Sequence, residues 1–544
     1  MRKKTLSALL CTVAAMAVLT GCGGDKKETA AAPAEGNTTA AVTEAAKTEA
    51  ETTAAVQTEA GGEKNLVMPS ASCVANLNPL LEGYKEAAML NPIYDPLYVI
   101  DVNETRYYLA DSYEVSEDGM QITVKLKEGL KWHDGEAITA DDMIFTMDVC
   151  SDTNNGAGGT NIVILNDQPV KYEKVDDLTV KVTLPMASAS YADLLGGLTL
   201  IPEHVFEGNP SVVSAGEANM KGIGSGPYKV TEFKQDEYLL LEKYEDYYMG
   251  APSIDKVTFR IISDLSAQEV ALMNGEVNFM ELANAPAVAK YEADPNFTVV
   301  KYPEGRVNYL AVNKFCETVQ DPKVVEAVFA ALNRDEIIAG AYGDGMAESA
   351  NSIFSNVNTF YDSSVEGYTQ DVEKAKQLVK ETGLDSKTLT LYFNSERVYM
   401  KESAQIIQQQ LKNVGINLEV IPLESAGFFE KVFGTDGDYE FYLNGYGAVG
   451  DPDQVVAGMY DGTWGVNLAV SDEVSQLWKD ARTVYTPEER AAIYKQIQIQ
   501  TRDELTCYPI AYPNYVFVTT SNIKGADTIK RTPVFENYTK LTME

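Results

Sequence analysis

Residues 129–143 read GLKWHDGEAITADDM, and they connect a predicted strand to a predicted helix. The strand comes before them, because apolar and polar side chains alternate over 120–127 as they do in a half-buried strand. The helix begins at their end, where Thr139 is followed three residues later by Asp142, the spacing of a capping box. We therefore expect Trp132-His133-Asp134 to form the turn between the two elements.

The rest of the chain also mixes helices and strands. Asp321-Pro322 supplies an N-cap and a first-turn proline, so we expect a single helix from there to about Ala339. A glycine ends each of two further helical patterns. The other predicted elements are a strand at 178–184, helices at 372–382 and 400–414, and a strand at 416–420. This order of helix, glycine and strand indicates an α/β fold class.

Composition and charge exclude several classes of protein. The 544 residues contain 44 Lys+Arg against 80 Asp+Glu, a formal net charge of −36, so the surface would repel a nucleic acid. Hydrophobic residues make up 45% of the chain, enough for a folded body of roughly three or four units or two large lobes. Only two histidines are present and the sequence contains no phosphate-binding loop, so we predict no catalytic residue, no metal site and no cofactor.

The N-terminus carries the pattern of an export signal. Three cations precede a hydrophobic segment, 6–19, that is too short to span a bilayer by itself. Leu19-Thr20-Gly21-Cys22 follows and resembles a bacterial lipobox, so we expect a signal peptide at 1–21 and a lipid on Cys22; an ordinary secretory signal is the alternative. Residues 22–64 contain no aromatic side chain and are predicted to be a disordered linker that tethers the folded body.

Four cysteines remain in the folded body, at Cys73, Cys150, Cys316 and Cys507. They lie far apart in sequence and form no CxxC pair, so nothing indicates metal or redox chemistry. Disulfide bonds and isolated buried thiols are both compatible with this spacing.

The 129–143 stretch resembles the W-x-D-G-x-x-x-T-A-x-D signature of extracellular solute-binding protein family 5, the peptide/nickel-type receptors of ABC importers. Five further segments resemble signatures of this family, in the family's order. They are 224–228, 309–313, 321–335, 408–416 and 450–453. Each motif is short, but six of them in this order are specific, and with the lipobox they extend the resemblance over essentially the whole mature chain.

The resemblance implies a two-lobed periplasmic-binding-protein-like fold of type II, with an extra subdomain in the first lobe, that closes on a hinge. The implied divisions are lobe I at 65–312 with an inserted subdomain at about 97–222, lobe II at 313–509, and a C-terminal return to lobe I at 510–544. Asn313 and Tyr512 lie near the expected crossings between the lobes.

The resemblance also implies the function of a receptor rather than an enzyme. Such a receptor, anchored by its lipid on the outer face of the bacterial cell membrane, captures a small solute and delivers it to an ABC permease with its ATPase subunits. We expect a monomer, a short peptide as the solute, and no nucleic acid. The alternatives are a non-peptide solute such as a metal chelate or an organic acid, a surface sensor of the same fold, and a surface hydrolase. The scarcity of histidines counts against the hydrolase.

Ala448 is the position where this sequence departs from peptide-binding members of the family. Those members usually place an aspartate three residues before the Asp-Pro at 451–452, where it pairs with the α-ammonium of the ligand. Without that carboxylate, a buried ammonium loses a charge-assisted hydrogen bond worth about 1.5 to 3 kcal/mol, so another acid must replace it or the ligand lacks the group.

The candidate ligand-binding residues are Asn76, Asn394, Arg397, Tyr446, Ala448, Asp451 and Trp464. Arg397 precedes the predicted 400–414 helix and is placed to offer a bidentate fork to a ligand carboxylate. A solvated surface arginine is the alternative.

Overall fold

A computed structural model of the chain describes residues 63–81, 89–100, 104–447, 449–461, 468–528 and 538–544. The predicted signal peptide, Cys22 and nearly all of the predicted linker lie outside the described residues. Within the described part of the chain, no helix is long and apolar enough to cross a membrane.

The first sheet joins the start of the described chain to later strands. Its order is β1-β12-β11-β10, with β1 parallel to β12 and the other neighbours antiparallel. The strands are β1 (Asn65–Ser70), β10 (Tyr228–Lys234), β11 (Tyr238–Lys243) and β12 (Lys256–Ile261). Leu66, Leu241 and Phe259 of this sheet share a hydrophobic core with Phe517, so the two ends of the described chain fold together.

A second four-stranded sheet, with the order β4-β5-β9-β8, is antiparallel throughout. Its strands are β4 (Ala110–Val115), β5 (Gln121–Leu126), β8 (Lys171–Asp176) and β9 (Thr179–Thr183). One hydrophobic core contains Trp132 and residues of this sheet, of helix α1 (Ala140–Ser151) and of helix α3 (Tyr191–Gly196). We call the elements around this core the α1 subdomain.

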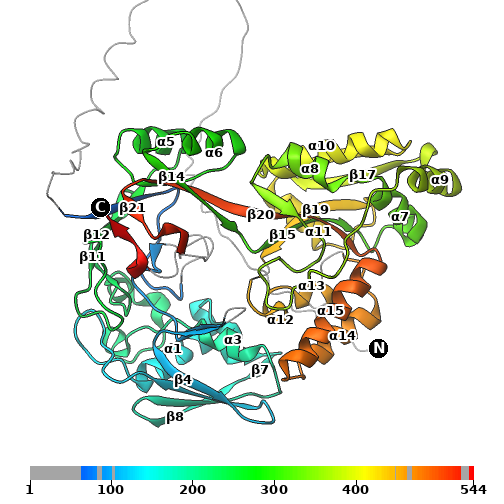
Figure 1. Ribbon diagram of the computed structural model, residues 1–544. Coiled ribbons are helices and arrows are strands. Elements are labelled where there is room, and N and C mark those ends of the chain that lie inside the picture. Colours follow the sequence, from blue (N-terminus) through cyan, green and yellow to red (C-terminus); the bar gives the residue numbers. More distant parts are fainter. Residues whose placement is uncertain (1–62, 82–88, 101–103, 448, 462–467, 529–537) are drawn as a thin grey trace, which may run out of the picture. The chain divides into compact units, whose positions relative to one another are not determined.

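The third sheet follows the path β13-β20-β15-β19-β17-β18, and β14 and β16 also pair with β20. β20 (Cys507–Thr520) pairs through its N-terminal part with β15 and through its C-terminal part with β13 and β14. Figure 1 shows β20 running past both β14 and β15. β17 is parallel to both of its neighbours. The other strands are β13 (Phe279–Glu281), β14 (Phe297–Pro303), β15 (Arg306–Val312), β16 (Ala347–Ser349), β17 (Thr388–Asn394), β18 (Asn417–Leu423) and β19 (Phe441–Gly447).

Two hydrophobic cores flank the strands β15 to β19, and helices supply the other side of each core. Helices α7 to α10 contribute to one core, and α11, α13, α14 and α15 contribute to the other. We call these strands and helices, with the short α12, the β19 subdomain. The helices are α7 (Pro322–Ala331), α8 (Arg334–Ala341), α9 (Val372–Thr382), α10 (Val398–Asn413), α11 (Ser425–Val432), α12 (Pro452–Val455), α13 (Ala457–Tyr460), α14 (Asp472–Ala481) and α15 (Pro487–Asp503).

The remaining elements are short. The helices are α2 (Thr160–Val163), α4 (Gly216–Asn219), α5 (Leu265–Met273) and α6 (Ala285–Glu292). The strands are β2 (Tyr98–Ile100), β3 (Thr105–Tyr107), β6 (Ile164–Leu165), β7 (Gln168–Pro169), β21 (Ile523–Lys524) and β22 (Thr542–Met543).

Most of the predicted elements are confirmed, and one is wrong. The strands at 120–127 and 178–184 are β5 and β9, the helices at 372–382 and 400–414 are α9 and α10, and the capping box of Thr139 with Asp142 is formed. The single helix expected from Pro322 to about Ala339 is two helices, α7 and α8. Leu332 is extended between them, and the side chain of Asn333 accepts the backbone N–H of Glu336 and caps α8.

The structure describes all four cysteines of the folded body, and none of them is in a disulfide bond. Cys150, Cys316 and Cys507 are buried and Cys73 is partly exposed. Of the two arrangements compatible with the sequence, the structure therefore has the isolated thiols.

Candidate functional site

The candidate site lies where the carboxyl ends of three strands of the β19 subdomain meet. β17 runs parallel to β18 and to β19, so these three strands end at the same edge of the sheet. Antiparallel β15 begins at that edge, with Arg306 opposite Gly447. In open α/β sheets, ligands bind outside the carboxyl ends of the strands, because the connecting loops there leave a crevice. The chain segments that follow β17 and β19 carry most of the predicted ligand-binding residues.

Arg397 follows β17 at this edge and is the residue before α10. Its guanidinium forms no hydrogen bond or ion pair with any residue that the structure describes, although the side chain is half-buried. A half-buried cation with unused donors is suited to bind a carboxylate in the bidentate geometry that a guanidinium prefers.

Asn394, the last residue of β17, positions this turn. Its side-chain oxygen accepts the backbone N–H of Glu396 at 3.0 Å, and its amide nitrogen donates to the hydroxyl of Ser425 at 2.9 Å. The residue is only 2% exposed. Asn394 therefore holds the segment that presents Arg397.

Arg306 and Asn308 of β15 belong to the same edge, and sequence reasoning missed both. The Nε of Arg306 donates to the side-chain oxygen of Asn308 at 3.2 Å, and its Nη2 donates to the carbonyl of Gly445 at 2.8 Å. A Cβ on Gly445 would lie 2.1 Å from that side-chain oxygen of Asn308, so only glycine permits this arrangement. The available signal was the alternation of polar residues 306 and 308 just before the apolar part of the strand.

Two tyrosines extend the cluster. The amide nitrogen of Asn308 donates to the hydroxyl of Tyr342 at 2.8 Å. The ring of Tyr342 stacks on that of Tyr399 in α10, with ring centroids 5.3 Å apart and planes 28° apart. The hydroxyl of Tyr399 is buried and has no hydrogen-bond partner among the described residues. A buried hydroxyl without a partner is costly, so this one is a candidate to bind a ligand atom.

Glu304 adds negative charge next to these cations, and Glu281 lies near Glu304. Burial raises the pKa of Glu304, and the nearby guanidinium groups of Arg306 and Arg397 oppose that shift. Partial desolvation and repulsion by Glu304 raise the pKa of Glu281, and a hydrogen bond with Tyr515 opposes it. The side chain of Glu281 reaches solvent. The site edge thus offers both cationic and anionic groups.

Two predicted residues are engaged inside the protein. The hydroxyl of Tyr446 donates to the carbonyl of Ile353 at 2.6 Å and lies 3.0 Å from the hydroxyl of Tyr460. The carboxylate of Asp451 is buried against Arg490 and Tyr494. These polar groups fix the end of β19 and the segment that follows it, and the ring of Tyr446 packs on that of Tyr309 with ring centroids 5.2 Å apart.

The other predicted residues are dispersed or outside the described chain. Asn76 lies in the loop after β1, where its side-chain oxygen accepts the backbone N–H of Asn78 at 2.8 Å. Ala448 and Trp464 lie outside the described residues. Among the residues that the structure describes, no group of three or more His, Cys, Asp or Glu side chains is arranged to hold a metal ion.

The 129–143 stretch is bonded to the 224–228 turn through His133. His133 lies between two glycines of the 224–228 turn: its Nδ1 accepts the backbone N–H of Gly224 at 3.2 Å, and its Nε2 lies 2.9 Å from the carbonyl of Gly226. These contacts require a neutral ring with the proton on Nε2. Two family-like motifs therefore bind each other, away from the site edge.

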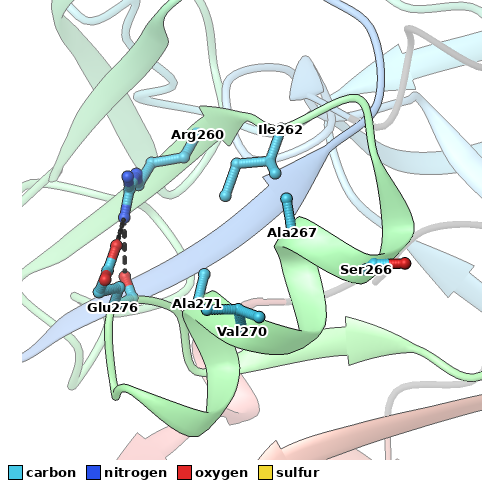
Figure 2. A pocket seen from close by; sticks show the side chains of 7 residues that line it. All are labelled: Arg260, Ile262, Ser266, Ala267, Val270, Ala271 and Glu276. Atoms are coloured by element: carbon cyan, nitrogen blue, oxygen red, sulfur yellow. Dashed lines mark hydrogen bonds and ion pairs between the residues drawn. The ribbon is translucent and has the colours of Figure 1, made fainter. Parts of the chain in front are cut away.

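An open pocket of about 470 Å³ lies elsewhere, between β12 and α5. Figure 2 shows that it is bounded by the ion pair of Arg260 with Glu276 at 3.1 Å and by small apolar side chains, while the hydroxyl of Ser266 points away from them. None of the predicted ligand-binding residues lines it. We therefore place the candidate site at the strand edge, where unused donors and charges converge.

Comparisons with known proteins identify the class. The family model "Bacterial extracellular solute-binding proteins, family 5 Middle" matches residues 104–467, and the chain belongs to this family. The chain has the two-lobed periplasmic-binding-protein fold of that family, and the family consists of solute-binding proteins rather than enzymes.

Three of the proteins similar to this chain illustrate how far the similarity extends. The dipeptide-binding protein of Escherichia coli is 27% identical over 499 residues, which cover 85% of this chain and 92% of the relative. The ABC transporter substrate-binding protein CtaP of Listeria monocytogenes has a crystal structure that matches with a TM-score of 0.82 at 32% identity, covering 88% of this chain and 99% of CtaP. The putative peptide-binding protein AppA of Clostridium difficile matches with a TM-score of 0.81 at 33% identity, covering 89% and 100%.

Proposed function

We propose that this chain is the substrate-binding receptor of an ABC importer and that its solute is a short peptide. The observation that carries this proposal is the half-buried guanidinium of Arg397, which has no partner among the described residues and stands at the strand edge beside Glu304. Relatives named as peptide-binding proteins support it. A zwitterion matches a site that presents a free cation and carboxylates together.

In this proposal, cationic and anionic side chains of the site bind opposite ends of the peptide. Arg397 binds the ligand's carboxylate as a planar fork. Glu304 and Glu281 replace the aspartate that is missing at position 448 and accept the ligand's ammonium. A bound ammonium would stabilise both carboxylates in their charged form and reverse the upward shift of their pKa values.

The proposal also includes the lobes and the membrane anchor. We place the crossings between lobes at 303–306 and 513–514, because β14 and β15 pair with different parts of β20 on either side of those residues. This placement moves the boundary from the one inferred at 312–313. The lipid on Cys22 would hold the receptor at the outer face of the membrane, as a monomer that passes its solute to a permease without any catalytic step.

A non-peptide solute is the second candidate, and Ala448 favours it. A metal chelate or an organic acid carries negative charge that Arg397 and Arg306 can bind, and such a ligand does not need an aspartate at 448. A surface sensor with the same binding site would differ only in its protein partner.

Mass spectrometry of the purified, never-refolded protein tests the proposal. We expect the wild type to release a ladder of short peptide masses. Arg397→Ala should purify without them, and Lys401→Ala, which removes an exposed cation one turn further along α10, should keep them. A single non-peptide mass from the wild type would overturn the peptide assignment and favour the second candidate.

A further inference from the structure

Helix α3 of the α1 subdomain contacts the segment that follows β19 through a set of hydrogen bonds. The carboxylate of Asp193 accepts the backbone N–H of Asp451 at 2.9 Å. The hydroxyl of Ser190 donates to the carboxylate of Asp453 at 2.8 Å and accepts from the amide nitrogen of Gln454 at 2.6 Å. These residues are more than 250 positions apart in sequence, so the bonds join two separately built parts of the chain.

A second pair of contacts lies beside these bonds. The backbone N–H of Ala189 donates to the carbonyl of Arg482 at 2.9 Å. The turn between β4 and β5 also meets the β19 subdomain, where a Cβ on Gly119 would lie 2.0 Å from the ring of Tyr485. We call the hydrogen bonds of Ala189, Ser190 and Asp193 with the β19 subdomain the latch contacts.

Within the β19 subdomain, Arg482 holds the residues of the latch contacts in place. Arg482 binds Asp453 through Nε at 2.5 Å and Asp461 through Nη2 at 2.6 Å. The side chains of Asp453 and Asp461 are 7% and 1% exposed, so this pairing is largely shielded from water. Asp453 therefore presents one oxygen to Ser190 from a fixed position.

No hydrophobic core crosses this contact in the described part of the chain. The apolar residues of α3 belong to the core around Trp132, whereas those of α13 and α14 belong to the core of the β19 subdomain. A buried apolar core would make the contact permanent, because separating it costs free energy in proportion to its area. A contact made of exchangeable hydrogen bonds separates at a small cost, since water replaces each bond.

The latch contacts are also continuous with the candidate ligand site. β19 ends at Gly447, and Asp451 and Gln454 follow within the same stretch of chain. Asp451 is in turn fixed by Arg490, so the latch segment is tied to α15. A ligand that contacts the end of β19 therefore lies next to the chain segment whose residues Asp451 and Gln454 bind the α1 subdomain.

We propose that the latch contacts hold the α1 subdomain against the β19 subdomain when the ligand site is closed and release when it opens. This inference rests on the proposed receptor function and names its conformational control.

Hydrogen exchange of the full-length chain, followed by mass spectrometry, tests the latch directly. The test variant is Ser190→Ala with Asp193→Ala, which removes the three side-chain hydrogen bonds that cross the contact. The matched control is Ser214→Ala with Glu217→Ala, which removes a hydroxyl and a carboxylate at two exposed positions. The hydroxyl of Ser214 donates to the carbonyl of Ser211, three residues before it. Small-angle X-ray scattering of the same samples reports whether the subdomains separate.

We expect roughly tenfold faster exchange across 186–190 and 449–461 in the test variant, together with a larger radius of gyration, and no change in the control. Exchange at Ala189 is the decisive signal, because neither substitution removes its acceptor on Arg482. Faster exchange confined to the amide of Asp451, with an unchanged radius, would overturn the latch.

A double-mutant cycle isolates one pair of the latch. Gln454→Ala and Ser190→Ala should each accelerate exchange, and the combined variant should fall short of the product of the two effects because the residues share one bond. The receptor function is tested separately by the solute that the wild type retains. If the wild type retains no peptide, the proposed function fails but the exchange result still supports the latch. If exchange is unchanged in the test variant, the latch fails but peptide binding is unaffected.

Discussion

Arg490 and Asp451 form a buried bidentate ion pair behind the candidate site. Nη2 of Arg490 lies 3.0 Å from Oδ1 of Asp451, Nη1 binds the other carboxylate oxygen, and the side chains are 6% and 8% exposed. The ring of Phe360 lies 5.1 Å from the guanidinium carbon. This pair fixes the Asp-Pro segment to α15.

Breaking this pair from one side should be strongly destabilising. Arg490→Met leaves the carboxylate of Asp451 buried without its cation, and we expect a loss of about 3 to 5 kcal/mol in the free energy of unfolding, measured by urea titration. Lys376→Ala removes a cation paired with Glu373 at an exposed position and should cost less than about 0.5 kcal/mol. Equal effects of the two substitutions would contradict the structural role of Arg490.

The stability of the protein should depend on pH through His133. Burial lowers the pKa of this histidine to about 4, below the value of about 6.5 for an unfolded histidine. The unfolded state therefore binds more protons between these values, and the contribution of the neutral ring is complete above pH 6.5 and lost as the pH falls toward 4. Between pH 7.5 and 5 we expect the wild type to lose about 2 kcal/mol more than His133→Gln in urea titrations.

Asp95 should make the stability of the protein fall as the pH rises, which is opposite to the effect of His133. Its carboxylate accepts the hydroxyls of Tyr247 and Tyr248, each at 2.8 Å, but burial raises its pKa to about 7. The native state binds more protons than the unfolded state between pH 4 and 7, so this group lowers stability as the pH rises through that range. Asp95→Asn should therefore gain stability relative to the wild type between pH 5 and 8, by at most about 3 kcal/mol. If the difference in stability between Asp95→Asn and the wild type stays constant across that range, the raised pKa of Asp95 is contradicted.

The 224–228 turn should tolerate no side chain at its centre. A Cβ on Gly224 would lie 1.9 Å from the carbonyl oxygen of Ile93, a backbone atom that cannot move aside. We expect Gly224→Ala to lower the free energy of unfolding by on the order of 3 kcal/mol, which for a chain of this length corresponds to a fall of roughly 3 °C in the unfolding temperature. Gly216→Ala is the control, because its Cβ would meet no atom within 4 Å, and it should leave the unfolding temperature nearly unchanged.

Local signals predicted most elements but could not predict a break between helices. The alternation over 120–127 and the glycines at 383 and 415 report structure within a few residues, and the elements they mark are present. Between α7 and α8 the apolar spacing continues across Leu332, so a periodic pattern alone joins the two helices. The break depends on Asn333, which both caps α8 and exchanges backbone bonds with the side chain of Gln410 on α10.

The candidate site was only partly predictable for a similar reason. Arg397 was identified because it precedes a recognisable helix. Arg306 and Asn308 were not, since their place beside β19 depends on strand order, which local sequence patterns do not report. Asp451 and Tyr446 have suitable chemistry, but their polar groups are used by Arg490, Ile353 and Tyr460, which are distant in sequence.

Tyr399 offers a test that separates ligand binding from stability. Its hydroxyl is buried without a partner in the described part of the chain, so removing it should not weaken the ligand-free protein. We expect Tyr399→Phe to keep or slightly raise the free energy of unfolding and to lower ligand affinity about fivefold to tenfold in calorimetric titration with the released solute. Tyr342→Phe is the matched control: it removes the acceptor of Asn308 and should cost about 1 kcal/mol of stability. If Tyr399→Phe binds the solute as tightly as the wild type does, the hydroxyl of Tyr399 is not part of the ligand site.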